Sequence, residues 1–310
     1  MKRISNVLLV LFVIIAFGCD NDENKKGRFL LKGNEKMEEN DPKSAMQFYT
    51  EALELDSTYS DAYYNKALAH LQLNQLGESI QDLGLAIRHK PDYYDAIFQR
   101  GLNYLDNGEF YNAKEDALKL IELDDQNWKS YFLTGLVEEK LKDFSKAFEA
   151  FGKASDLNPE NSDLLVNQAT VLFYQKDYDG AKKLLDEAIS INAMEPNLHN
   201  LRSMIYFDEQ NYSDALDAVE KAISLDKSQA YFYNNKGLYL LFLNRQEEGL
   251  DLINQSIKMD SKNPYALRNK GIYYVMQGDK TSALQYLVEL NQNYPDMDLV
   301  KEYLEKAQAL

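Results

Sequence analysis

Apolar residues recur along residues 128–161 at the spacing of two amphipathic helices joined by a short turn. Small residues stand at Gly135, Ala147 and Ala154, with aromatic residues at positions around them. Pro159 closes the stretch, because proline cannot continue a helix. Two such helices cannot cover all of their apolar surface by themselves, so the pattern predicts that the pair packs against neighbouring pairs.

The same pattern returns every 34 residues without an insertion. It predicts eight repeats, at residues 26–59, 60–93, 94–127, 128–161, 162–195, 196–229, 230–263 and 264–297. Position eight is always small: Gly33, Ala67, Gly101, Gly135, Ala169, Ser203, Gly237 and Gly271. Position twenty is also always small: Ala45, Ser79, Ala113, Ala147, Ala181, Ala215, Gly249 and Ala283. Position twenty-seven is small or leucine: Ala52, Ala86, Leu120, Ala154, Ala188, Ala222, Ser256 and Leu290. Helices that pack closely need small side chains where they cross, so these columns predict a packed helix pair in every repeat.

Other positions of the repeat carry aromatic, turn and helix-ending residues. Position four holds Tyr63, Tyr131 and Tyr233; position eleven holds Tyr104, Tyr206 and Tyr274; the turn at position fifteen holds Asn74, Gly108, Gln210, Asn244 and Gly278; and position thirty-two holds Pro91, Pro159 and Pro295. This arrangement resembles the tetratricopeptide repeat over about residues 26–296. It departs from that pattern in lacking tryptophan at position four and in placing Gly249 inside a helix, at a cost of about 1 kcal/mol relative to alanine.

The resemblance implies an all-α fold, a right-handed α-solenoid of eight helix–turn–helix repeats. Residues 297–310 predict one further amphipathic helix, which would cap the open end of the solenoid. We expect its apolar side to consist of Leu299, Tyr303, Leu304 and Ala307.

The N-terminus has a different pattern. Lys2 and Arg3 precede an unbroken apolar run over residues 7–17, which predicts a secretory signal peptide at residues 1–18. Such a run reaches only about 16 Å as a helix, well short of the ~30 Å of a bilayer core, so a membrane-spanning anchor is disfavoured.

Residues 16–19 resemble the lipobox of bacterial lipoproteins, with Gly18 before the cut and Cys19 after it. The resemblance implies that Cys19 carries acyl chains that anchor the protein in a bacterial cell envelope. We predict a polar acidic tether at residues 19–25. Its acidic cluster resembles the export signal of Bacteroidetes surface lipoproteins, whereas Asp20 also resembles an inner-membrane retention signal of enteric bacteria, so the choice of membrane stays open. The outer membrane, on its periplasmic or cell-surface face, is the favoured location.

Composition and residue spacing argue against several kinds of partner and site. The net charge of −16 disfavours nucleic acid as a partner. Cys19 is the only cysteine, which excludes an internal disulfide and a zinc–cysteine cluster. His70, His89 and His199 show neither metal-ligand spacing nor a nucleophile partner. We therefore predict no catalytic residue, no metal and no cofactor.

The resemblance implies a concave groove lined by the first helix of each repeat, through positions two, five, nine, twelve and thirteen. We expect this groove to contain mostly bulky apolar side chains: Tyr64, Leu68, Phe98, Leu102, Phe132, Leu136, Val166, Phe173, Tyr174, Phe207, Leu238, Phe242, Arg268 and Met276, with Met204 also at position nine. Close packing between adjacent first helices would instead bury some of them, and this alternative stays open. Arg268 stands alone at position five, so no carboxylate clamp is predicted.

Asparagine recurs at position six, in Asn65, Asn167, Asn235 and Asn269. In the family such residues bond the backbone of a bound peptide, but they also occur as structural residues, and both interpretations are kept.

The leading hypothesis is a lipid-anchored, non-catalytic scaffold that binds a protein or peptide in its groove. The alternative is a fixed structural subunit of an envelope complex for export, gliding or outer-membrane biogenesis. Self-association through the terminal repeats is a further possibility, and an enzyme of peptide or glycan processing lacks a supporting site.

Overall fold

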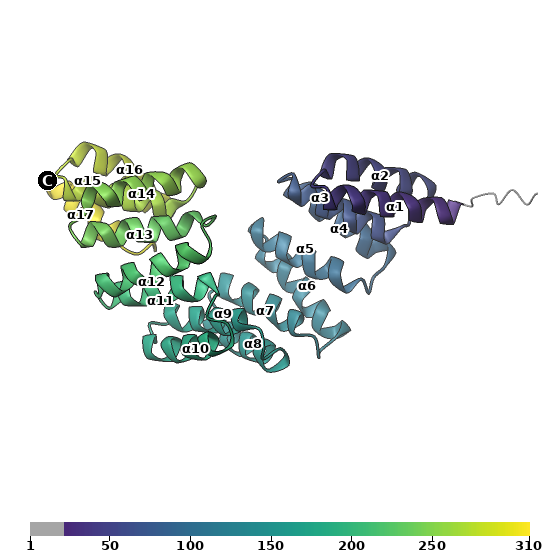
Figure 1. The fold of residues 1–310 in the computed structure, drawn as a ribbon, viewed down its shortest axis with the longest axis horizontal. Coiled ribbons are helices and arrows are strands. Elements are labelled where there is room, and N and C mark those ends of the chain that lie inside the picture. Colours follow the sequence, from purple (N-terminus) through teal and green to yellow (C-terminus); the bar gives the residue numbers. More distant parts are fainter. Residues whose placement is uncertain (1–21) are drawn as a thin grey trace, which may run out of the picture. The chain divides into compact units, whose positions relative to one another are not determined.

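The computed structural model describes residues 22–310, and every regular element in that range is an α-helix (Figure 1). The predicted signal peptide at residues 1–18 and the lipidation site Cys19 lie outside the described residues. The first helix begins at Asp22, so the last four residues of the predicted tether are helical.

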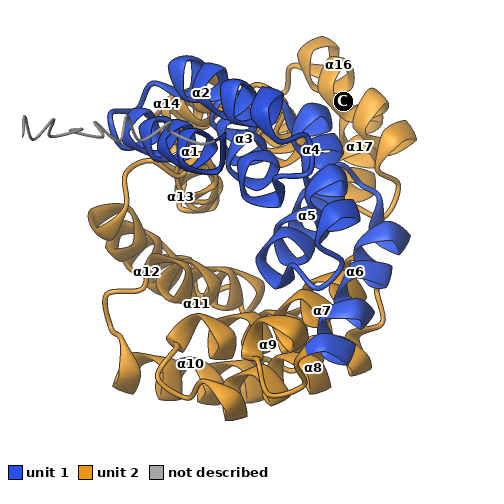
Figure 2. Ribbon diagram, turned by 90° about the vertical axis from the view of Figure 1, so that its right-hand side faces the viewer, with its two compact units in different colours: residues 1–123 blue, residues 124–310 orange. Residues whose placement is uncertain are grey.

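The chain divides into two compact units between Leu123 and Asp124 (Figure 2). Unit 1 contains α1 (Asp22–Glu38), α2 (Pro42–Leu55), α3 (Ser60–Gln72), α4 (Leu76–His89), α5 (Tyr94–Asp106) and α6 (Phe110–Leu123). Unit 2 contains α7 (Trp128–Lys140), α8 (Phe144–Leu157), α9 (Ser162–Tyr174), α10 (Tyr178–Ile191), α11 (Pro196–Asp208), α12 (Tyr212–Leu225), α13 (Ala230–Phe242), α14 (Gln246–Met259), α15 (Pro264–Met276), α16 (Lys280–Asn293) and α17 (Val300–Ala309).

Within each unit the helices pack in sequence order. The two helices of a repeat pack against each other, as α1 does with α2 and α7 with α8. The second helix then packs against the first helix of the next repeat in the same unit, as α2 does with α3 and α8 with α9. The predicted all-α solenoid of stacked helix pairs is confirmed.

The three columns of small residues lie where the paired helices meet. Every residue at positions eight, twenty and twenty-seven is buried, as predicted. Glycine stands at position eight where an aromatic ring crosses it: a Cβ on Gly33 would lie 2.2 Å from the Tyr49 ring, and one on Gly135 would lie 2.5 Å from the Phe151 ring. At these two crossings the glycine leaves room for the aromatic ring sixteen residues later.

Gly249 has a clear role despite its low helix propensity. A Cβ on Gly249 would lie 2.8 Å from the carbonyl oxygen of Gly237, and a Cβ on Gly237 would lie 2.8 Å from the carbonyl oxygen of Gly249. The backbones of α13 and α14 touch at this crossing, and only glycine leaves room on both sides.

Position fifteen adopts the same backbone conformation in all eight repeats. Its φ angle is positive, between 57° and 77°, in Asn40, Asn74, Gly108, Lys142, Lys176, Gln210, Asn244 and Gly278. The residue after it donates its N–H to the carbonyl of position eleven, as Glu109 does to Tyr104 at 2.7 Å. This left-handed turn satisfies a free carbonyl at the end of each first helix. The predicted turn position is confirmed, although only two of its residues are glycine.

The predicted capping helix is present but shorter than residues 297–310. It runs from Val300 to Ala309 and packs on α15 and α16. Val300, Tyr303 and Ala307 are buried, whereas Leu299 precedes the helix with a φ of 67°. Leu299 and Leu304 are half-buried and pack against the same hydrophobic core as Tyr303 and Ala307, so the predicted apolar side is confirmed, and Val300 adds to it. None of the helices in residues 22–310 combines the length and the apolar character needed to cross a bilayer.

The fold predicts that Gly135→Ala lowers the free energy of unfolding by about 1–3 kcal/mol, because the added Cβ would overlap the buried Phe151 ring. Gly84→Ala in α4 is the matched control. Its Cβ would make only an ordinary 3.9 Å contact with Arg100, so better helix propensity should raise the stability by about 0.5–1 kcal/mol. Urea unfolding followed by circular dichroism measures both, and equal effects of the two substitutions would contradict the packing described.

Candidate functional site

A cavity of about 310 Å³ lies among the first helices α7, α9 and α11 of unit 2. The residues around it come from three consecutive repeats: Phe132, Asp163, Val166, Asn167, Thr170, Tyr174, Glu195, Asn197, Asn200, Leu201 and Met204. The five residues from α9 occupy positions two, five, six, nine and thirteen, which fall on one face of a helix. Four of these five positions are among those that the repeat resemblance assigned to the groove.

Helix caps fix the two acidic residues at the edge of this cavity. Asn161 precedes α9, and its side-chain oxygen accepts a hydrogen bond from the N–H of Asp163 at 3.0 Å. Glu195 precedes α11, and its carboxylate accepts the N–H of Asn197 at 3.0 Å. Asp163 and Glu195 therefore stand at the amino-terminal ends of adjacent first helices.

The interior of the cavity is partly apolar. Val166 and Leu201 are almost fully buried and form its floor together with neighbouring apolar residues. Tyr174 is 47% exposed, and its ring stacks on Phe144 at 5.7 Å, so it presents an accessible aromatic surface. Thr170, which also lines the cavity, donates its hydroxyl to the carbonyl of Val166 at 2.8 Å.

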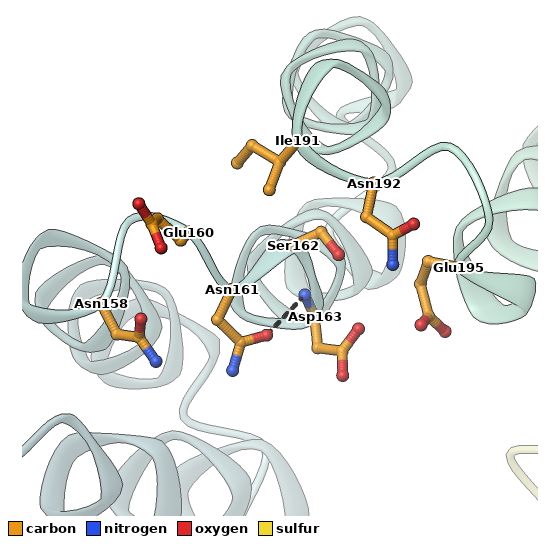
Figure 3. A pocket seen from close by; sticks show the side chains of 8 residues that line it. All are labelled: Asn158, Glu160, Asn161, Ser162, Asp163, Ile191, Asn192 and Glu195. Atoms are coloured by element: carbon orange, nitrogen blue, oxygen red, sulfur yellow. Dashed lines mark hydrogen bonds between the residues drawn. The ribbon is translucent and has the colours of Figure 1, made fainter.

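A second cavity of about 390 Å³ adjoins the first and is shown in Figure 3. Asp163 and Glu195 line both cavities. Burial raises the pKa of the Glu195 carboxyl above its usual range; the N–H of Asn197 opposes this shift, and the hydrogen bond with Asp163 adds to it. Asp163, which is exposed, thus acts on the Glu195 carboxyl, which is half-buried.

Glu139 is a further acidic residue close to this cavity. Burial raises the pKa of the Glu139 carboxyl on α7, although Lys140 lies 3.8 Å away and opposes the shift. Glu139 also acts electrostatically on Tyr174, at the other end of the cavity. Neither cavity has a lysine, arginine or histidine among its lining residues.

The cavity brings together part of the predicted groove. Phe132, Val166, Tyr174 and Met204 line it, together with Asn167. The other predicted groove residues of unit 2 do not line this cavity. Four of them are half-buried: Leu136, Phe207, Phe242 and Met276. Three are buried: Phe173, Leu238 and Arg268. Those of unit 1 are all half-buried: Tyr64, Leu68, Phe98 and Leu102.

Aromatic packing explains part of this burial. Phe207 on α11 packs edge-on against Phe242 on α13 at 5.1 Å and stacks on Tyr239 at the same distance. Tyr212 completes the cluster, 5.1 Å from Phe242. At these positions the bulky side chains stabilise the contact between neighbouring repeats, which is the alternative that the sequence left open.

Most of the position-six asparagines hold adjacent first helices together. Three of them donate a side-chain N–H to an asparagine of the preceding repeat: Asn65 to Asn34 at 3.1 Å, Asn235 to Asn200 at 2.9 Å, and Asn269 to Asn234 at 2.8 Å. The donated amides are therefore engaged within the protein, and the structural interpretation accounts for them.

Asn167 and Arg268 behave differently from those three. Asn167 donates to the carbonyl of Asp163 in its own helix at 2.7 Å, and it lies in the cavity. Arg268 is 6% exposed, donates to Asn269 at 2.9 Å and to the carbonyl of Asp298 at 3.2 Å. Burial lowers the pKa of Arg268 to about 10. Its guanidinium is held inside unit 2 and forms no accessible clamp.

The three histidines take part in local packing. His70 lies 3.4 Å from Asp82 and 2.7 Å from Gln75, both within unit 1. His89 stacks on Tyr63 at 5.8 Å, and His199 contacts the carbonyl of Ala193 at 2.9 Å. No group of three or more His, Cys, Asp or Glu residues within residues 22–310 is arranged to hold a metal ion.

Most of the polar residues of the cavity were not predicted from the sequence. Asp163 and Asn197 at position two, Asn200 at position five and Thr170 at position nine all occupy groove positions, but we selected only bulky residues and Arg268. Glu195 lies in the connection between repeats, where the repeat pattern assigns no ligand contact. Its proximity to Asp163 arises from the stacking of α9 and α11.

The hydrogen bonds of Asn269 and Asn167 predict different losses of stability when each residue is replaced by alanine. Asn269→Ala should lower the free energy of unfolding by about 1–3 kcal/mol, because buried groups of Arg268 and Asn234 lose their partner. Asn167→Ala removes only a bond within its own helix, so we expect a change within about 0.5 kcal/mol. Thermal and urea unfolding of both variants checks this, and a larger loss for Asn167→Ala would contradict the assignment.

Solved structures similar to this chain are helical repeat proteins. Yeast Tom70 is 18% identical with a TM-score of 0.62, and the match covers 94% of this chain and 65% of Tom70. A tetratricopeptide repeat protein from Parabacteroides merdae is 14% identical with a TM-score of 0.61, and the match covers 80% of this chain and 98% of that protein. PilF from Pseudomonas aeruginosa is 21% identical with a TM-score of 0.53, and the match covers 69% of this chain and 97% of PilF. At these identities the likeness concerns the fold. No curated protein sequence matches this chain.

Family models described as tetratricopeptide repeat match most of the chain. The matched residues are 29–59, 48–81, 98–162, 140–205, 196–229 and 265–296. They agree with the 34-residue period, the buried small columns and the stacked helix pairs. The chain belongs to the tetratricopeptide repeat family.

Proposed function

We propose that this protein is a non-catalytic scaffold, anchored by lipid in a bacterial cell envelope, that binds a protein or peptide partner in the groove of unit 2. Proteins of this family bind protein or peptide partners, characteristically on the concave surface that their first helices form. The observation that carries the proposal for this chain is the cavity on α7, α9 and α11.

The lining of this cavity suits a polypeptide. It combines apolar floor residues, an accessible tyrosine and amide side chains that can bond a backbone, as in Asn167 and Asn197. Polypeptides bind grooves of this kind by inserting apolar side chains while polar groups orient the chain. Three repeats contribute, so the surface extends along several residues of a bound segment.

The envelope location rests on the N-terminal sequence. A short apolar run ends at Cys19, the only cysteine, in a lipobox-like context. Several acyl chains would hold the protein stably, because each buried CH₂ contributes about 0.8 kcal/mol. The outer membrane is the proposed site.

Cross-linking in cells tests the groove. A photoreactive aromatic amino acid in place of Tyr174, an exposed residue that lines the cavity, keeps a ring at that position. Position 183, an exposed lysine on α10 that does not line the cavity, is the control. We expect covalent adducts with another polypeptide from position 174 and few from position 183, because a photoreactive group captures only what it touches. Adducts of the same kind and yield from both positions, or none from position 174, would contradict the proposal.

A substitution at the N-terminus tests the anchor separately. In cells fed an alkyne-tagged fatty acid, the native protein should become labelled and sediment with membranes. Cys19→Ser should remain unlabelled, because the acyl chains have no thiol to attach to. The check is gel fluorescence of the immunoprecipitated protein, and an unlabelled native protein would refute the lipid anchor while leaving the groove unaffected.

A further inference from the structure

Two carboxylates meet where the two cavities of unit 2 join. Asp163 lies in the first turn of α9, and Glu195 immediately precedes α11. Figure 3 shows their carboxylates projecting to the same side of the connections between repeats. The apolar cavity on one side and the polar cavity on the other both open onto this pair.

Among residues 22–310, no lysine, arginine or histidine lines either of the cavities that this pair borders. Two basic residues of the adjoining helices form ion pairs with other carboxylates: Arg202 on α11 pairs with Asp186, and Lys182 on α10 pairs with Glu209. The amino-terminal ends of α9 and α11 offset part of the negative charge, and one of the two carboxyls accepts the N–H of Asn197. Burial is the main cause of the raised pKa of Glu195, and the neighbouring charge of Asp163 adds to it.

A basic side chain is the ligand that relieves this repulsion. A guanidinium or ammonium group can donate to both carboxylates at once, and such charge-assisted hydrogen bonds are strong where water is partly excluded. The net charge of −16 also favours the approach of a basic partner. A metal ion is a poorer fit, because Ca²⁺ and Mg²⁺ require six or more oxygen ligands and two side chains supply few of them.

We propose, as a refinement that rests on the proposed function, that the bound polypeptide carries a lysine or arginine next to a bulky apolar residue. The cation lies between Asp163 and Glu195, and the apolar side chain enters the cavity lined by Phe132, Val166, Leu201 and Met204. Because the carboxylates themselves line that cavity, the two subsites suit residues one or two apart in an extended segment, which advances about 3.3 Å per residue.

A display library of random twelve-residue peptides, selected on the purified native protein, tests this refinement. The selected peptides should be enriched in lysine or arginine beside an aromatic or large aliphatic residue. Their affinity should fall at least about tenfold for the variant carrying both Asp163→Asn and Glu195→Gln. Each single variant should also bind these peptides more weakly than the native protein does. The matched control carries Asp179→Asn and Glu187→Gln, two exposed residues of α10 that line neither cavity. It loses the same charge and should bind like the native protein.

The variant Thr170→Phe distinguishes binding in the groove from the preference for a basic residue, because it fills the apolar cavity and keeps both carboxylates. Selected peptides that depend on Thr170 but show no basic preference, or that bind the doubly neutralised variant equally well, would overturn this refinement and leave the proposed function standing. A library that yields no peptide sensitive to Thr170→Phe would contradict both. Calcium chloride that raises the melting temperature of the native protein, but not of the doubly neutralised variant, would assign the carboxylates to a metal and overturn the refinement.

Discussion

The fold depends on how closely the two helices of each repeat can approach. A helix pair of this length has too little apolar surface to be stable alone, so each pair must pack tightly within itself and against its neighbours. Glycine, alanine or serine at positions eight and twenty removes the side-chain volume that would keep the helices apart. The freed space is filled by a larger residue such as Tyr49 or Phe151. Repetition of this one contact gives each unit its stacked order.

Much of this order could be predicted from the sequence. The columns of small residues have a strict period, so they located each helix pair, and the structure buries every residue in them. The left-handed turn at position fifteen was harder to predict, since lysine at 142 and 176 is not typical of that conformation. There the hydrogen bond back to position eleven imposes the turn. The role of Gly249 could not be predicted either. Helix propensity indicates that glycine destabilises the helix, but it does not indicate that the backbone of α13 lies against this position.

The groove was predicted less completely than the fold. Position in a repeat tells which face of a helix a side chain occupies, but not how near the next first helix lies. Leu238 and Arg268 therefore appeared accessible in the sequence and are buried in the structure. The cavity also uses polar residues that a search for apolar side chains passes over. Asp163 and Glu195 belong to different repeats, and only the stacking of α9 on α11 brings them together. The signal peptide and the acylation of Cys19 stay predictions from the sequence.

A double-mutant cycle between Gly135 and Phe151 tests the central claim most directly. Two other repeats of the chain pair alanine with leucine at these positions, Ala67 with Leu83 and Ala169 with Leu185. If size matching governs the approach of the helices, Phe151→Leu should make room for Gly135→Ala. The double variant should then be more stable than the sum of the two single losses implies, by about 1 kcal/mol or more in the free energy of unfolding. Strictly additive losses would show that glycine at position eight is not set by the ring above it, and would contradict the account.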